Sequence, residues 1–431
     1  MIYNKDSKIN DYLFFGYTLD RPFDFQRLED VGLIKLKDYS DDTLISLFKD
    51  IMSDCLPDES TFNKCIIPLS GGWDSRLLLG AALNKYPKSK IVAVTYGTPG
   101  QLDFELGKLI SKECGIKHVE YDLNKEKVSW EKLIDTAKLS PWTYVPDGFY
   151  NYRMLDLITE NSENSENSEN IVLSGFMGDP LTGGHISDSE DYKNALCKFI
   201  AKQRKSRTLY LPRNNYAPLS DVCAGDFASK FFDYDEVYDI AIRQVNCIAP
   251  IVTFRKNSSP WETKFRVNSN LTMITPFSDL RWASFWSQTG KENKIGQKQY
   301  FNLILRLYPE LYKLPSKINY GASFDGGKIN LLTKKLQSKT KIFLNKISPK
   351  YFSKNKAPIN YIDFDEAFRK REDFKDVLEF AISYLEEMNV VPWIDINNIR
   401  EAHEAYKKNH GDALLILVGL AVNLYAESGK G

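Results

Sequence analysis

The sequence has 431 residues, enough for two or three domains with a sizeable core. Its 57 lysines and arginines balance 57 aspartates and glutamates, so no net positive field favours nucleic acid as a partner. The six cysteines lack the spacing of metal ligands and indicate reduced thiols. The sequence shows no leader-like start and no apolar run of membrane-spanning length, and we expect a cytoplasmic protein without a transmembrane segment.

A glycine-rich turn separates an apolar run at 65–69 from a helical pattern at 77–83. This turn reads Ser70-Gly71-Gly72-Trp73-Asp74-Ser75. The two glycines allow backbone N–H groups to face an anion, the two serines add hydroxyls, and the following helix directs its positive end to the same place. Asp74 would repel a phosphate unless a cation accompanied it, which indicates a nucleotide with magnesium. The alternative is an ordinary tight turn between a strand and a helix.

Strands and helices are predicted to alternate from about residue 60 to 185. Segments 90–96 and 117–121 are predicted as the second and third strands, and a helix is expected at 102–114, where Gly115 ends it. This alternation predicts a parallel sheet covered on both faces.

Ligands of such sheets bind outside the carboxyl ends of the strands. The glycine-rich turn lies at that edge, together with Thr95 and Gly97 at the end of the 90–96 strand. Asp103 and Glu105 are expected to form a charged first turn of the following helix, with contact to ATP as the alternative.

A second turn of small residues follows a short apolar strand at 171–173 and contains Asp179. Two carboxylates from two loops can bracket a cation that bridges phosphates, so Asp74 and Asp179 are predicted as a pair of ligands. The alternative for each is an aspartate that only forms a turn. Just before this strand, residues 160–170 repeat serine, glutamate and asparagine, which predicts a disordered insertion without a catalytic role.

Beyond about residue 190 the patterns become mainly helical, with clear apolar periodicity at 377–388 and 413–426. Segment 334–356 is rich in lysine with interspersed apolar residues. We expect it to be a solvated helix face and loop. The alternative is contact with an anionic or lipid-linked substrate.

The order Ser-Gly-Gly-x-Asp-Ser resembles the signature of the ATP pyrophosphatases. The segment from 174 to 185 is similar to the asparagine synthetase pattern Ser-Gly-Glu-Gly-Ala-Asp-Glu-Leu-Phe-Gly-Gly-Tyr. It matches at Ser174, Gly175, Asp179, Leu181, Gly183 and Gly184. Two weaker similarities are the stretch 275–279, where the alternative is a helix cap at Asp279, and the stretch 314–321. The chain therefore resembles the synthetase domain of asparagine synthetase and its relative β-lactam synthetase.

The resemblance implies a role for each candidate residue. Asp74 and Asp179 would hold the magnesium of ATP. Lys317 would act in catalysis by stabilising charge on the α-phosphate and the adenylated carboxyl group, with a solvated lysine or Lys313 in that role as the alternatives. The nucleotide-binding residues would be Ser70, Gly71, Gly72, Asp74, Ser75, Thr95, Gly97, Gly175 and Asp179.

The fold expected from this resemblance is α/β. Residues 1–60 resemble the tail of a glutaminase domain, residues 61–190 form a parallel-sheet ATP pyrophosphatase (adenine nucleotide α-hydrolase-like) core, and residues 191–431 form a mainly helical region. Ile2 stands where glutamine-dependent members have a cysteine, which predicts a stand-alone form without the glutaminase domain. Its nitrogen would come from ammonia, an amine or a partner protein.

The predicted activity is that of an AMP-forming amide ligase that uses ATP and Mg²⁺ to join a small-molecule or sugar-linked carboxylate to nitrogen. Stand-alone relatives are associated with surface-polysaccharide biosynthesis. Phe176 replaces the family's glutamate at the reacting centre and can neither accept a proton nor pair with ammonium. Asparagine biosynthesis proper and a catalytically retired ATP-binding module are the alternatives. A tRNA-modifying pyrophosphatase is disfavoured, because no cysteine is near the predicted site.

Overall fold

The computed structural model describes residues 8–10, 12–13, 36–139, 141–142, 145, 149–150, 153–154, 157–158, 170–175, 178–183, 271–323, 327–352 and 362–429. Its strands are β1 (Cys65–Pro68), β2 (Ile91–Gly97), β3 (Lys117–Asp122), β4 (Asn170–Leu173) and β5 (Leu271–Ile274). They form one five-stranded sheet in the order β3-β2-β1-β4-β5, and every neighbouring pair is parallel. The predicted α/β fold with a parallel sheet is confirmed.

The helices before the fourth strand are α2 (Asp41–Cys55), α3 (Asp74–Lys85), α4 (Leu102–Cys114) and α5 (Trp130–Leu139). Those that follow it are the short α7 (Gly178–Leu181), α14 (Leu280–Gln288), α15 (Lys291–Lys294), α16 (Lys298–Leu307), α17 (Pro309–Lys313), α18 (Gly327–Ile347), α19 (Pro349–Phe352), α20 (Phe364–Lys370), α21 (Glu372–Glu387), α22 (Ile396–Glu404) and α23 (Gly411–Glu427). Single 3-10 turns lie at Lys88–Lys90, Leu123–Lys125, Pro276–Ser278 and Ile295–Gln297.

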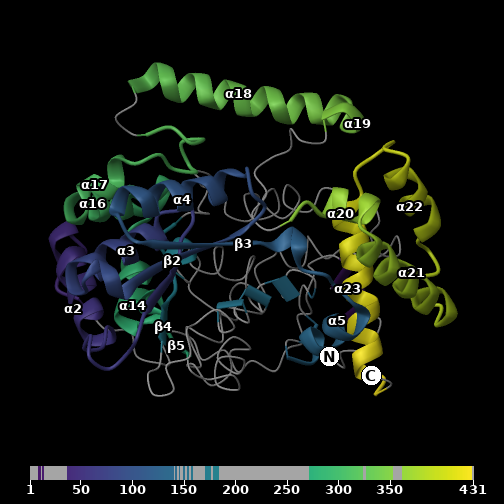
Figure 1. The fold of residues 1–431 in the computed structure, drawn as a ribbon, viewed down its shortest axis with the longest axis horizontal. Coiled ribbons are helices and arrows are strands. Elements are labelled where there is room, and N and C mark those ends of the chain that lie inside the picture. The colour runs from purple at the N-terminus through teal and green to yellow at the C-terminus, as the bar shows by residue number, and fades with distance from the viewer. Residues whose placement is uncertain are drawn as a thin grey trace.

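Strands β1, β2 and β4 are mostly apolar because their side chains are buried on both faces of the sheet, whereas β3 is polar and partly exposed. One face, which includes Cys65 and Ile67, packs with α2, α3, α14 and α16 in a single core. On the other face Ile66 and Val92 pack with Met154 and Ile158. Figure 1 shows α2, α3 and α14 gathered at one side of the sheet.

A second core joins α5 to α20, α21, α22 and α23 at the opposite side of the molecule (Figure 1). Helix α23 is buried around most of its circumference, which explains why its sequence is apolar on every face. Helix α18 lies apart from both cores, along the top of the view in Figure 1.

Most sequence predictions of secondary structure are confirmed. Gly115 ends α4 in the left-handed conformation with φ 65°, and α21 and α23 cover the two periodic segments near the carboxyl end. The region predicted as mainly helical is helical in its described part, and it also supplies the unpredicted strand β5, whose four residues Leu271–Ile274 extend the sheet beside β4. The repeat at 160–169 and residues 191–270 lie outside the described residues, and the domain boundaries stay predictions.

Candidate functional site

The site is built at the carboxyl edge of the sheet. Strand β1 leads into the glycine-rich turn, and β4 leads into Ser174 and Gly175. Strand β2 ends nearby at Gly97, whose φ of 139° favours glycine. Because β2, β1 and β4 are parallel neighbours, these three ends lie side by side, as the sequence predicted.

Each N–H group at the start of the glycine-rich turn donates to a side-chain oxygen. The Ser70 N–H donates to Ser75 Oγ at 3.3 Å, and the Gly72 N–H donates to Ser70 Oγ at 3.2 Å. The Gly71 N–H donates to Asp103 Oδ1, also at 3.2 Å. Three consecutive N–H groups just before α3 therefore donate to oxygen atoms, as those of a phosphate-binding loop do.

The two predicted aspartates meet. The backbone N–H of Asp179 donates to Asp74 Oδ2 at 3.0 Å. This approach depends on glycine, since a Cβ atom at Gly178 would overlap the Asp74 carboxyl group and one at Gly175 would lie 2.9 Å from Asp74 Cβ. The two loops are therefore in contact at the point where the carboxylates lie.

Two buried side chains hold this pair in place. The hydroxyl of Tyr300 donates to Asp74 Oδ1 at 2.5 Å, and Gln297 Nε2 donates to Asp179 Oδ1 at 2.8 Å. Gln297 also donates to Thr182 Oγ1 at 2.8 Å, and it adopts a left-handed conformation with φ 56° that is uncommon outside glycine. The segment before α16 is thus shaped to bring an amide to the Asp179 loop.

The electrostatics of the pair favour a cation. Burial and, to a smaller extent, the like charge of Asp179 together raise the pKa of Asp74 to about 8, against the lowering effect of the Tyr300 hydrogen bond. A carboxylate in this position is costly to ionise unless positive charge is added. Magnesium is commonly held by one or two carboxylates together with phosphate oxygens, so this donor set fits it.

Lys317 contacts the glycine-rich turn and the first turn of α4. Its backbone N–H donates to the Gly71 carbonyl at 3.1 Å, and its Nζ forms an ion pair with Asp103 Oδ2 at 2.5 Å. Asp103 is therefore held by both the Gly71 N–H and the Lys317 ammonium. The first turn of α4, expected mainly as a charged helix start, thus points a carboxylate into the site.

Arg76 fastens these loops to each other. Its guanidinium is completely buried and donates to the carbonyl groups of Leu311 at 3.2 Å, of Leu314 at 3.0 Å and of Pro315. It also donates to the Gly71 carbonyl at 3.4 Å and stacks over the Trp73 ring at 4.7 Å. Burial lowers the pKa of Arg76 to about 10, so the group stays charged at neutral pH.

A cavity of about 240 Å³ opens between these elements. It is lined by Pro68, Leu69, Ser70, Thr95, Tyr96, Asp103 and Lys317. Thr95 Oγ1 donates to the Leu69 carbonyl at 3.0 Å, so this side chain also supports the wall below the glycine-rich turn. The cavity brings together candidate residues from the glycine-rich turn, β2, α4 and the Lys317 loop.

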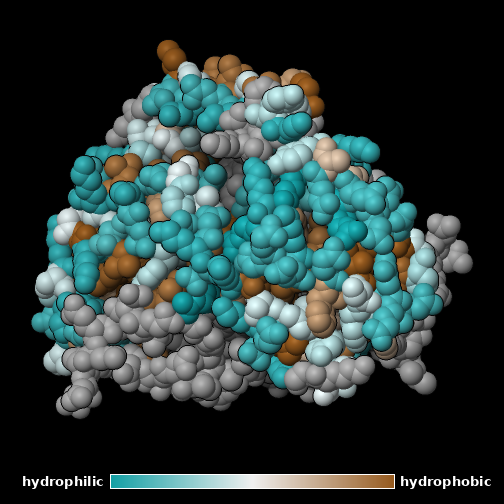
Figure 2. Space-filling view, turned by 45° about the vertical axis from the view of Figure 1, so that its right-hand side comes forward, coloured by the Kyte–Doolittle hydropathy of each residue, from teal (hydrophilic) through white to brown (hydrophobic). Residues whose placement is uncertain are grey.

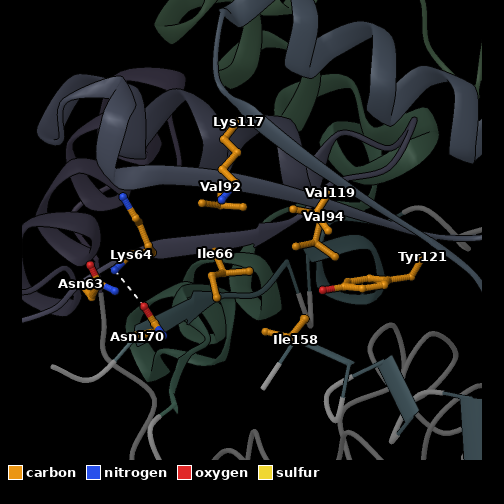
Figure 3. Close-up of a pocket in the computed structure, with 10 residues that line it drawn as sticks. All are labelled: Asn63, Lys64, Ile66, Val92, Val94, Lys117, Val119, Tyr121, Ile158 and Asn170. Atoms are coloured by element: carbon orange, nitrogen blue, oxygen red, sulfur yellow. Dashed lines mark hydrogen bonds between the residues drawn. The ribbon is translucent and has the colours of Figure 1, made fainter. Parts of the chain in front are cut away.

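Another cavity, of about 50 Å³, lies along the face of the sheet that carries Ile66, Val92 and Val94 (Figure 3). Asn63 and Lys64 precede β1, and Asn170 begins β4 with its Oδ1 accepting the Lys64 N–H at 3.0 Å. None of the predicted site residues lines this cavity, so it does not belong to the site.

The profile of the asparagine synthase family matches residues 48–304, more than half of the sequence. The chain belongs to the asparagine synthase family. It is therefore an asparagine synthetase-like ATP-dependent ligase of the class that forms carbon–nitrogen bonds. No curated protein matches the sequence. Within the described residues, no helix is both long and apolar enough to cross a bilayer.

For this asparagine synthase family member, sequence reasoning missed Tyr300, Gln297 and Arg76. Tyr300 and Gln297 lie within the matched range but in a segment without a recognisable motif, and Arg76 directly follows the predicted loop. Asp279 caps α14 by accepting the Arg281 N–H at 2.8 Å, which agrees with the helix-cap alternative. Phe176 lies outside the described residues.

Proposed function

We propose that this chain is an AMP-forming amide ligase. A substrate carboxylate attacks the α-phosphorus of ATP, pyrophosphate leaves, and an acyl-adenylate forms. A nitrogen nucleophile then attacks the acyl carbon, loses a proton and displaces AMP. Adenylation is useful because a free carboxylate is a poor electrophile, whereas AMP is a good leaving group.

One observation carries this proposal. The glycine-rich turn is in direct contact with both other candidate loops, through the Asp179 N–H to Asp74 hydrogen bond on one side and the Lys317 N–H to Gly71 hydrogen bond on the other. The N–H groups of the turn, the paired carboxylates and the Lys317 ammonium group therefore meet around one loop, and Ser70 and Lys317 line the cavity beside it. An ordinary turn would need none of these partners.

Asp74 and Asp179 are the residues that would hold Mg²⁺. The bound ion would neutralise charge on the leaving pyrophosphate. The protein's own part is to fix both carboxylates before ATP arrives, with Tyr300 donating to Asp74 and Gln297 donating to Asp179. Gly175 and Gly178 allow the close contact between the loops.

Lys317 is the proposed stabiliser of negative charge on the α-phosphate and on the tetrahedral acyl carbon. In this structure its ammonium group is paired with the Asp103 carboxylate. The phosphates of ATP would take over both this ammonium and the Gly71 N–H. Ser70, Gly72 and Ser75 would bind the remaining phosphate oxygens, while Thr95 and Gly97 would flank the nucleoside.

The acceptor is proposed to be a small-molecule or sugar-linked carboxylate, and the nitrogen is proposed to come from ammonia, an amine or a partner protein. A place in surface-polysaccharide biosynthesis agrees with the resemblance to stand-alone relatives. Asparagine formation is the alternative within the same chemistry.

Pyrophosphate release tests the proposal. The protein is incubated with ATP, Mg²⁺, a panel of aspartate and uronic acids, and ammonia or amines. Release that depends on one carboxylate, with AMP as co-product, supports the ligase. Binding of ATP without pyrophosphate, even with a cell extract as substrate source, would instead support the retired module.

Three substitutions make the test specific: Asp74→Asn, Asp179→Asn and Lys317→Ala should each abolish adenylation. Asp135→Asn on α5 and Lys49→Ala on α2 are matched controls at exposed positions and should retain it. Full activity in one of the three site variants would remove that residue from its proposed role.

A further inference from the structure

Helix α18 has a stripe of large apolar side chains that face solvent. The exposed fractions are 84% for Ile329, 70% for Leu332, 66% for Leu336, 61% for Phe343 and 64% for Ile347. Their spacings of three, four, seven and four residues place all five on one face of the helix. At 1.5 Å per residue the stripe is about 27 Å long.

Toward the carboxyl end of α18, the face opposite the stripe is covered by the protein, whereas residues 327–337 are exposed all around the helix. Asn345 is buried there, while Ser338 and Ile342 are partly buried. Hydrophobic residues are visible along the top of the molecule in Figure 2, where α18 lies in Figure 1. The helix therefore presents its apolar stripe outward.

The charge of this segment has one sign. Residues 327–352 contain seven lysines and no aspartate, glutamate or arginine, although the whole chain has a formal charge of zero. Lys328, Lys335 and Lys339 are exposed and lie beside the apolar stripe by helical spacing. An apolar face bordered by lysines is the pattern of a helix that lies in a membrane interface, with its apolar side chains below the headgroups and its ammonium groups among them.

We propose that α18 binds the surface of an anionic lipid bilayer. Charge complementarity favours this occupant over a second copy of the chain, because two such helices would bring their lysines together. Lysine is also depleted in interfaces between proteins. The proposal goes beyond the ligase activity and would hold for any reaction at the site.

Vesicle co-sedimentation tests the proposal with the full chain. Vesicles of phosphatidylcholine alone are compared with vesicles that also contain phosphatidylglycerol. The protein should bind the anionic vesicles, should bind the neutral ones much more weakly, and should lose affinity as salt is raised.

Two double variants separate the contribution of the apolar stripe to vesicle binding from that of the lysines. Leu336→Glu with Phe343→Glu should weaken binding by more than about tenfold, because it removes apolar area that the bilayer would bury and adds negative charge. Lys335→Glu with Lys339→Glu should weaken it by at least about tenfold through charge alone. Lys49→Glu with Lys112→Glu, at exposed positions on α2 and α4, is the matched control and should bind like the unmodified protein.

Circular dichroism and thermal unfolding establish that each variant is folded. Equal binding by the apolar-face variant and the unmodified protein would overturn the proposal, and so would the absence of binding to anionic vesicles. Sedimentation velocity tests whether α18 instead binds a second copy of the chain or an acidic protein. The proposal would also be overturned if the protein bound no vesicles but associated with itself, or with an added acidic protein, and the α18 substitutions abolished that association.

Discussion

Replacement of Tyr300 by phenylalanine tests how the site holds Asp74. The Tyr300 side chain is fully buried, its ring contacts Trp282 and Trp286 edge-on, and its hydroxyl donates to Asp74 Oδ1 at 2.5 Å. Phenylalanine keeps the ring and removes only the donor. A hydrogen bond to a charged group contributes about 1.5–3 kcal/mol, so the ionised Asp74 should lose about that much stabilisation. Magnesium-dependent nucleotide affinity should therefore fall by roughly 10- to 100-fold.

Isothermal titration calorimetry with an α,β-methylene analogue of ATP measures this effect, with and without Mg²⁺. The analogue cannot be cleaved between the α and β phosphates, so binding is separated from turnover. Tyr86→Phe is the control, because it also removes a buried tyrosine's hydrogen bond, to the Pro57 carbonyl at 2.8 Å, but far from the site. An unchanged affinity in a stably folded Tyr300→Phe protein would refute the role of Tyr300 in preparing Asp74.

Three further outcomes follow from described contacts. Gly178→Ala should cost about 1–3 kcal/mol of stability or separate the two loops, because the new methyl group overlaps the Asp74 carboxyl group; thermal unfolding and analogue binding report on this. Asp103→Asn should tighten nucleotide binding by about 2- to 10-fold, because the Asp103 carboxylate occupies the Gly71 N–H and the Lys317 ammonium, which phosphate needs. Weaker binding in the same titration would instead indicate that Asp103 contacts the nucleotide. Burial lowers the pKa of His403 below its usual 6.5, and its Nδ1 accepts the His410 N–H at 2.8 Å. Below pH 6.5 the unfolded chain therefore takes up a proton at this position more readily than the folded protein does. The free energy of unfolding should be at its full value above pH 6.5 and should fall by up to about 1.4 kcal/mol per pH unit below it. Urea unfolding across this range should show that slope, and a His403→Gln protein should show less of it.

Strands β1, β2 and β4 could be predicted because they are short apolar runs followed by small or polar residues. The meeting of the Asp74 and Asp179 loops also followed from the sequence, since β1 and β4 are parallel and any turn that follows either must reach the same edge. The strand β5 was missed because its four residues carry no pattern that distinguishes them from a helical segment.

The support of the site could not be predicted in the same way. Tyr300 is 226 residues away from Asp74 along the chain, and Gln297 is 118 residues away from Asp179. Only the folding of α16 against the sheet brings them near, and neither has a motif around it. Asp103 has the local sequence of a helix start, so its second contact with Lys317 depends on where the distant loop comes to lie.

The buried guanidinium of Arg76 has a consequence for how this chain can be recombined with its relatives. The residue belongs to α3, yet the carbonyl groups of Leu311, Leu314 and Pro315 that accept its hydrogen bonds belong to the carboxyl-terminal half. A chimera whose junction lies between the sheet and the later helices would take the Arg76 guanidinium from one parent protein and the carbonyl groups that accept its hydrogen bonds from the other. A crossover placed beyond Lys317 would instead carry donor and acceptors together, so that the nucleotide half and its proposed lysine would be exchanged as one piece.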